Sequence, residues 1–226
     1  MASSLGPNVS ESGLVLCLDA ADKNSYPGTG TTWTDLSGNN NNATLTNGPT
    51  FNTSGIGNIL LDGVDDYISV ENNTILNPSN VTVSIWVKRN GYQSSIGSFI
   101  RRNYNDSYAI FATYNADTSF FRIYDGTTYP SSPTIVLPLN TWINIVGTYD
   151  GANIKIYKNG IFSGQTANTT SISYSSSNTQ MTIGRDDPFS GRYMSANYGT
   201  VMVYNRSLTD AEILQNYNST KSRFGL

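Results

Sequence analysis

The chain has 226 residues, of which 13% are charged, 38% are hydrophobic and 12% are aromatic, and its net charge is −3. This composition excludes a disordered chain, and the lack of a basic run argues against nucleic-acid binding. Histidine is absent and Cys17 is the single cysteine, which excludes an intramolecular disulfide, a histidine-based catalytic triad and the commonest metal ligand. We therefore expect one all-β domain with long polar loops.

The first half of the chain predicts short strands between polar loops. Residues 1–12 form a polar leader without the features of a secretory signal, and no apolar run is long enough for membrane insertion. A buried strand is expected over 13–18, and a long Gly-, Asn- and Thr-rich loop containing Trp33 follows it. Two strands are expected to flank an Asp62-Gly63 turn. Further strands are predicted over 81–89, 99–102, 108–113 and 119–124.

The segment 141–164 has the clearest structural signals in the chain. Asp150-Gly151 and Asn159-Gly160 separate β-branched runs, and such dipeptides favour hairpin turns because the central residues need positive φ. Three antiparallel strands are therefore predicted in succession. Their expected ranges are 142–149, 153–158 and 161–166.

The last part of the chain predicts two strands and a helix. Loop 125–138 contains three prolines and should be irregular, and strands are expected over 180–185 and 199–204. Thr209 and Glu212 form a capping-box pattern before a helix over 210–217. The predicted fold is therefore a jelly-roll sandwich of two antiparallel sheets with one short C-terminal helix. The expected division is a leader (1–12), a domain (13–217) and a C-terminal tail (218–226).

Five motifs occur in the order typical of laminin-G-like domains. They are LLDGVDDYISV, VTVSIWVK, TWINIVGTYDGANIKIYKNG, MTIGR and VYNRSLTDAEI. The chain thus resembles the concanavalin-A-like lectin/glucanase superfamily over about residues 13–217. The beginning of the chain and the tail EILQNYNSTKSRFGL are similar to virion structural proteins of tailed bacteriophages, especially marine and cyanobacterial ones. The superfamily contains lectins, glycosidases, adhesins and structural modules, so the fold alone does not define the function.

The acidic residues argue against an enzyme. Retaining glycosidases of this superfamily resemble one another in a strand that carries two paired carboxylates about 5–5.5 Å apart. The three glutamates here are Glu11 in the leader, Glu71 at a strand end and Glu212 in the helix cap. Asp65 and Asp66 are adjacent, so on a strand their side chains would point to opposite faces. We predict a non-catalytic protein.

A calcium ion is the one cofactor that the resemblance implies. Segment 35–40 resembles the D-x-S-G-N-G-N loop that many laminin-G-like domains carry near a rim calcium, and Ca²⁺ prefers such oxygen ligands. Gly199-Thr200 stands where many relatives have an aspartate pair, which removes one expected ligand. The alternative is that Asp35 and the Asp-Gly turn have structural roles only. The candidate metal ligands are Asp19, Asp35 and Asp62.

Glycan binding is the predicted activity. Sugar sites combine aromatic faces with hydrogen-bonding groups, and the loops supply both kinds. The Arg185-Asp186-Asp187 run beside Phe189 is chemically the most varied cluster, although Arg185 could instead pair with a nearby carboxylate and Phe189 could plug the end of the sandwich. The candidate residues are Trp33, Tyr92, Tyr104, Tyr129, Arg185, Asp186, Asp187, Phe189 and Tyr193.

The resemblance to tailed-phage proteins implies a virion protein assembled in a host cytoplasm, either a capsid decoration or a tail or fibre component. Expected partners are other virion proteins of the capsid or tail, surface glycans of the host, and further copies of the chain in a homo-oligomer. Two alternatives remain open: a cement or decoration protein without a glycan site, and a bacterial surface adhesin that binds carbohydrate.

Overall fold

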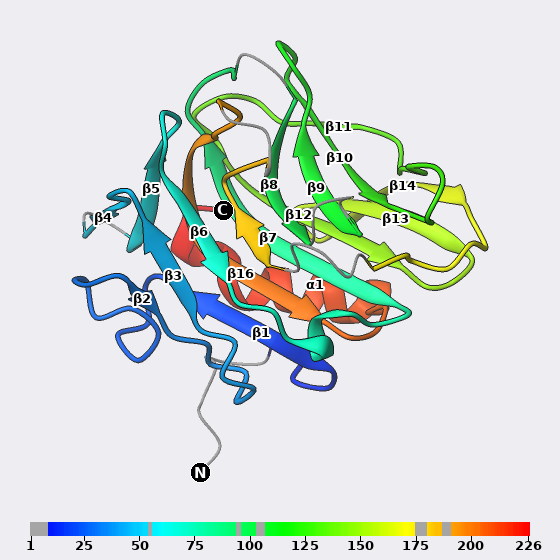
Figure 1. Ribbon diagram of the computed structural model, residues 1–226, viewed down its shortest axis with the longest axis horizontal. Helices are drawn as coiled ribbons and strands as arrows, with labels where there is room; N and C mark the ends of the chain where they lie inside the picture. The colour runs from blue at the N-terminus through cyan, green and yellow to red at the C-terminus, as the bar shows by residue number, and fades with distance from the viewer. Residues whose placement is uncertain (1–8, 54–55, 94–95, 103–106, 175–179, 187–190) are drawn as a thin grey trace.

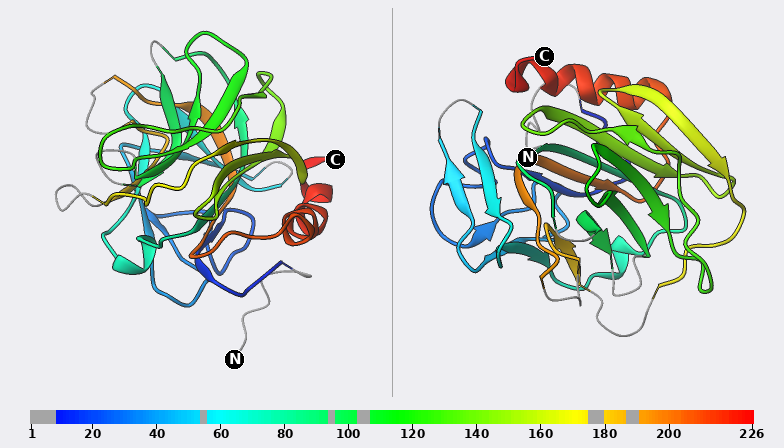
Figure 2. Two further views of the ribbon diagram at one scale, coloured as in Figure 1. Left: turned by 90° about the vertical axis from the view of Figure 1, so that its right-hand side faces the viewer. Right: turned by 90° about the horizontal axis from the view of Figure 1, so that it is seen from above.

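The computed structural model describes residues 9–53, 56–93, 96–102, 107–174, 180–186 and 191–226. Its strands form two antiparallel sheets, A and B, that pack face to face, and one helix lies on the outer face of sheet A (Figure 1, Figure 2). Apolar side chains from both sheets fill the space between them. The predicted all-β sandwich with a short C-terminal helix is confirmed.

Sheet A contains eight strands in the order β14-β13-β12-β7-β16-β5-β4, with β1 also paired to β16. Their bounds are β1 Leu14–Asp19, β4 Thr50–Asn52, β5 Asn58–Asp62, β7 Val81–Arg89, β12 Trp142–Tyr149, β13 Asn153–Lys158, β14 Ile161–Ala167 and β16 Ser195–Tyr204.

Sheet B contains eight strands in the order β11-β10-β9-β8-β15-β6-β3-β2. Their bounds are β2 Thr32–Trp33, β3 Ala43–Thr46, β6 Tyr67–Val70, β8 Gly97–Arg102, β9 Tyr108–Ala112, β10 Thr118–Ile123, β11 Ile135–Val136 and β15 Met181–Ile183. A short 3-10 helix, η1, spans Thr74–Leu76.

The predicted hairpins of β12, β13 and β14 are present. Asn159 and Gly160 have φ values of 52° and 75°, as the turn between β13 and β14 requires. The Asp150-Gly151 turn is longer than a two-residue hairpin loop, because Tyr149 pairs with Ile154. Its Asp150 carboxylate accepts hydrogen bonds from the backbone amides of Ala152 and Asn153, at 2.9 and 2.7 Å.

Both faces of β7 are covered. Val83 and Ile85 point into the core between the sheets, as predicted. Trp86 points to the opposite face, where its ring stacks on Phe224 with centroids 3.9 Å apart and its indole N–H donates to the Thr220 hydroxyl at 2.9 Å. These contacts attach the C-terminal segment to sheet A.

The C-terminal helix is longer than predicted. Helix α1 spans Asp210–Thr220, and a 3-10 helix, η2, continues over Lys221–Phe224. The capping box forms as expected, because Thr209 and Glu212 each accept the other's backbone amide hydrogen bond. Residues 218–224, predicted as part of a tail, therefore lie against the sheet.

Two segments that the sequence predicted to be loops contain short strands. The loop expected after residue 22 contains β2, β3 and β4, and the proline-rich loop contains β11. These strands have two to four residues, too few to show a period in the sequence. The strands that flank Asp62-Gly63 belong to different sheets, so this turn connects the two layers.

Cys17 is buried at 2% exposure, as expected for a small apolar side chain. Burial and the nearby carboxylates of Asp19 and Asp35 raise the pKa of its thiol well above the usual value. Such a thiol stays protonated and unreactive. None of the helices within the described residues is long and apolar enough to cross a membrane.

Candidate functional site

Asp186, the predicted acidic member of the glycan cluster, is held by internal ion pairs. It is 3% exposed and contacts Arg101 of β8 as well as Arg192, whose guanidinium lies 2.8 Å from the carboxylate. Arg101 is itself 1% exposed and pairs in register with Thr182 of β15. Asp186 therefore neutralises two arginines and has little surface left for a ligand.

The predicted residues Arg185 and Tyr129 belong to separate arginine–aromatic groups on sheet B. The Arg185 guanidinium lies 4.1 Å from the ring centroid of Tyr67 on β6. Tyr129 is 46% exposed, stacks on Tyr124 with centroids 4.8 Å apart, and has the Arg122 guanidinium 4.8 Å above its ring. Because three strands separate β6 from β10, these groups form no common site.

The remaining loop candidates are dispersed. Tyr92 is exposed, and its hydroxyl donates to the Asp117 carboxylate at 2.7 Å. Tyr193 forms an isolated backbone bridge with Arg185. Tyr104, Asp187 and Phe189 lie outside the described residues.

Trp33 was predicted as a glycan-binding residue, and the structure contradicts this prediction. Its side chain is completely buried and packs in the main core, on the two-residue strand β2. A buried ring cannot stack on a sugar, so Trp33 has a structural role.

Two of the three predicted metal ligands are occupied by protein groups. Asp19 accepts two hydrogen bonds from Arg223, at 2.6 and 2.7 Å. Asp35 is 7% exposed and accepts from the amides of Cys17, Ser37 and Asn41 at 2.8–2.9 Å. The carboxylate of Asp35 thus fixes the loop that resembles a calcium loop, which agrees with the structural alternative.

The third predicted ligand, Asp62, lies in a different acidic cluster. Oxygens of Asp62, Asp65 and Asp66 lie within 4.8 Å of one another. Asp66 also accepts the backbone N–H of Asp62 at 3.1 Å, and burial raises the pKa of its carboxyl group. Such a carboxylate set suits a hard cation such as Ca²⁺, but Asp19 and Asp35 are engaged elsewhere and do not contribute to it.

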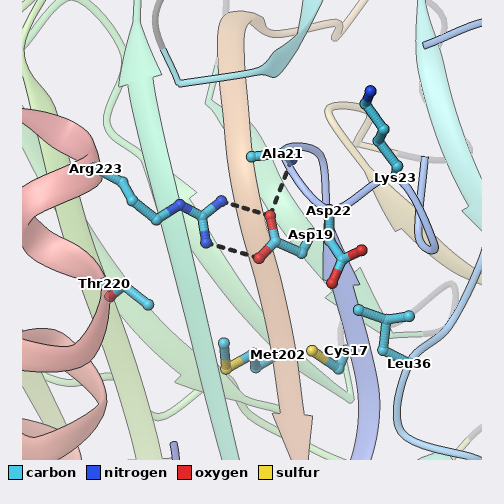
Figure 3. Close-up of a pocket in the computed structure, with 9 residues that line it drawn as sticks. All are labelled: Cys17, Asp19, Ala21, Asp22, Lys23, Leu36, Met202, Thr220 and Arg223. Carbon is cyan, nitrogen blue, oxygen red and sulfur yellow. Dashed lines mark hydrogen bonds and ion pairs between the residues drawn. The ribbon is translucent and has the colours of Figure 1, made fainter. Parts of the chain in front are cut away.

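A hollow of about 340 Å³ opens between β1 and the C-terminal helical segment (Figure 3). The Asp19–Arg223 ion pair crosses one part of it, with Lys23 on the loop beyond. Leu36 and Met202 line its apolar part. The hollow exists because Arg223, 204 positions along the chain from Asp19, attaches η2 to the end of β1.

Two further hollows border the first. The second, of about 430 Å³, shares Ala21 and Lys23 with it and is lined by the edge-packed rings of Tyr26 and Phe51. The third, of about 450 Å³, shares Arg223 with the first and Ile56 with the second. We call the three hollows together the C-terminal cleft.

The third hollow has the groups that a sugar site needs. Trp142 is half-buried, with its ring 5.0 Å from that of Phe224 and the Lys88 ammonium 5.7 Å from its centroid. Asn52 lines the same hollow with an exposed amide group, whereas Asn58 is 4% exposed and its side-chain carbonyl accepts a hydrogen bond from Asn197 at 2.7 Å. Concave sites with aromatic walls and a few polar groups are typical of small-molecule binding.

The carboxylates of the C-terminal cleft do not form an acid–base pair. Asp19 is paired with Arg223, and Asp22 accepts hydrogen bonds from the amide and side chain of Asn24 at 2.8 and 3.0 Å. Both carboxylates are therefore engaged by protein groups within the cleft.

Of the cleft residues discussed above, the sequence singled out only Asp19, and it did so as a metal ligand. Arg223 lay in the segment expected to be a tail, and Trp142 was interpreted only as the start of a strand. The Asp19–Arg223 contact joins the two ends of the chain, and no local pattern predicts such a pair.

Comparisons with known proteins identify the family and the fold. Residues 62–214 match the family described as the concanavalin A-like lectin/glucanases superfamily. The search of curated proteins gave no match. Similar solved structures include the binding domain of botulinum neurotoxin DC in complex with SialylT (TM-score 0.71, 16% identity), covering 92% of this chain and 52% of that chain.

Two other similar structures have the same relationship to this chain. Botulinum neurotoxin type C, whose cell entry depends on two ganglioside molecules, gives a TM-score of 0.72 at 17% identity, over 92% of this chain and 51% of that one. The binding domain of paraclostridial mosquitocidal protein 1 gives a TM-score of 0.69 at 17% identity, and the match covers 92% of this chain and 52% of that one. This chain spans about half the length of these structures, and the likeness shows the fold alone.

Proposed function

The chain belongs to the concanavalin A-like lectin/glucanase superfamily, and we propose that it is a non-catalytic, glycan-binding structural protein of a tailed-phage virion. The single observation that carries the binding role is the C-terminal cleft. It combines the accessible part of Trp142 with amide and ammonium groups in one hollow. The loop cluster on sheet B offers less accessible surface, because Asp186 and Arg101 are buried against each other.

The positions of the carboxylates support a role without hydrolysis. Glu212 is bound by Arg206 at 2.9 Å, and Glu71 accepts from Gln180 at 3.1 Å. The closely spaced Asp62, Asp65 and Asp66 line none of the three hollows of the cleft. A glycosidase would need two carboxyl groups on either side of a bound sugar.

The virion role rests on the resemblance of both chain ends to tailed-phage structural proteins. A single shallow cleft binds a glycan weakly, and many copies on one particle would bind a cell surface by avidity. A complex with SialylT and an interaction with two ganglioside molecules are stated for the similar neurotoxin structures, which supports host-surface glycans as the class to test.

Glycan-array binding with a multimerised form of the protein tests the proposed site. We expect binding that is lost in Trp142→Ala and reduced in Lys88→Met, which keeps the side-chain stem and removes the charge. Tyr129→Ala is the matched control, because Tyr129 is an exposed aromatic residue in the loop between β10 and β11 of the other sheet. Binding lost in Tyr129→Ala and kept in Trp142→Ala would move the site to the loops of sheet B.

Electron microscopy of the native particle tests the virion role. A cleft that faces solvent on a capsid or tail surface supports glycan binding, whereas a cleft buried against neighbouring subunits supports the cement alternative. Absence of the protein from every particle contradicts both virion roles.

A further inference from the structure

The third hollow of the C-terminal cleft lies over a row of side chains on the outer face of sheet A. Trp142 of β12 pairs in register with Lys88 of β7, and Lys88 pairs with Asn197 of β16. Residues directly opposite each other in an antiparallel ladder point to the same face, so these side chains share the face of Trp86. Lys88 therefore stands between an aromatic ring and an amide.

The Lys88 ammonium has no carboxylate partner among the described residues. It lies 5.7 Å from the centroid of the Trp142 ring, and its other strand neighbour, Asn197, is uncharged. By contrast, the Lys155 ammonium on β13 lies 3.0 Å from the Asp150 carboxylate. The positive charge of Lys88 is therefore available to a ligand in the hollow.

The charge of the third hollow is positive, although the whole chain has a net charge of −3. None of the described residues that line it is acidic, and its two charged members are Lys88 and Arg223. Asp19 neutralises Arg223 from the first hollow, with hydrogen bonds of 2.6 and 2.7 Å. The charge of Lys88 remains, and a concave site with one sign of charge attracts ligands of the opposite sign.

The size and walls of the third hollow indicate a ligand larger than a simple anion. Its volume of about 450 Å³ is in the range of sites that hold small organic molecules. Trp142 and the ring of Phe224 form an apolar wall, and Ser222 on η2 is exposed and carries a hydroxyl group. A sugar ring with an acidic substituent has the complementary features: an apolar face, hydroxyl groups and a negative charge.

We propose that the third hollow binds a glycan that carries an acidic group, either a carboxylate or a sulfate. The Lys88 ammonium donates charge-assisted hydrogen bonds to that group, while the sugar ring lies against the accessible part of Trp142. This inference rests on the proposed glycan-binding function and names the class of glycan. The attraction is local, because salt at 0.1 M screens charges that are more than about 10 Å apart.

Binding to pairs of glycans that share one core tests the proposal. One pair is a sialylated glycan and its desialylated form, and the other is a sulfated glycan and its unsulfated form. Wild type should prefer the acidic member by about tenfold, as one charge-assisted hydrogen bond provides. Lys88→Met should bind both members equally, whereas Lys88→Arg should retain the preference. Lys155→Met is the matched control, because Asp150 already binds that ammonium, and it should behave as wild type.

Salt dependence and melting temperature complete the experiment. Unchanged melting of the Lys88 variants shows that they fold, and the preference of wild type should fall as salt rises from about 0.05 to 0.5 M. A preference in one pair only identifies the acidic group. Equal binding of both members by wild type, or a preference that persists in Lys88→Met, overturns this inference and leaves glycan binding in place. Failure to bind any glycan contradicts the proposed function itself, and this inference with it.

Discussion

The C-terminal cleft on sheet A and the Arg185–Asp186 loop on sheet B both contain an aspartate paired with arginine. They differ in how much polar and aromatic surface remains accessible beside that pair. In the loop, Asp186 is surrounded by two arginines and is almost completely buried. In the cleft, Asp19 and Arg223 neutralise each other at the edge of a hollow and leave Lys88, Asn52 and part of Trp142 accessible. A varied set of polar residues in sequence therefore does not predict a binding site, because internal partners can satisfy every group.

The largest expected effect concerns the loop. Asp186→Ala removes the partner of Arg101, which is 1% exposed, and an uncompensated buried charge costs about 3–5 kcal/mol of unfolding free energy. Urea denaturation checks this value, with the exposed Asp117→Ala as the control. A loss below about 1 kcal/mol would mean that Asp186 is free for ligand binding, and the contrast between the two regions would fail.

The next effect concerns the wall of the C-terminal cleft. Phe224→Ala removes the ring that stacks on Trp86 and borders Trp142, and a lost buried aromatic side chain costs about 3 kcal/mol. Thermal unfolding measures the loss, and Leu226→Ala is the control at an exposed neighbour. A Phe224 variant as stable as the wild type would show that its ring does not hold the C-terminal segment on sheet A, and that residues 218–226 are a tail outside the domain, as the sequence predicted.

The strands with strong local signals could be predicted, whereas the site could not. The strands 142–149 and 153–158 agree with the structure because Asn159-Gly160 and β-branched residues act locally. The capping box at Thr209 is equally local. The C-terminal cleft depends on Asp19 meeting Arg223 across the whole chain, and β5 and β6 separate into different sheets for reasons that lie in tertiary packing.

A smaller effect separates the two roles considered for Asp35. Asp35→Ala leaves the buried amides of Cys17 and Asn41 without their acceptor, which costs about 2 kcal/mol. We expect the same loss with added calcium and with a chelator, because the hydrogen bonds are internal to the protein. A loss that disappears in chelator would restore the calcium interpretation of this loop.

The smallest expected effect is a pH dependence at the start of α1. The Arg206 guanidinium lowers the pKa of Glu212 from its ordinary 4.5 to about 2. The stabilisation is therefore present above the ordinary pKa and is lost as pH falls from about 4.5 through 2. Because the pair is partly exposed, we expect about 1 kcal/mol.

Unfolding of wild type and Glu212→Gln across this pH range measures the effect. The glutamine keeps the neutral hydrogen bonds of the capping box, so the difference between the two proteins should shrink as the carboxylate is protonated. A difference that stays constant down to pH of about 2 would show that the charge contributes nothing.

The most direct test of the central claim uses the three tryptophans as separate NMR probes. Trp33 and Trp86 are buried, whereas Trp142 lines the C-terminal cleft, so each indole N–H reports on a different place. On titration with a glycan that the array identifies, we predict a saturable shift of the Trp142 indole signal, with the Trp33 and Trp86 signals unchanged. A glycan that binds while the Trp142 signal stays fixed would contradict the proposed site.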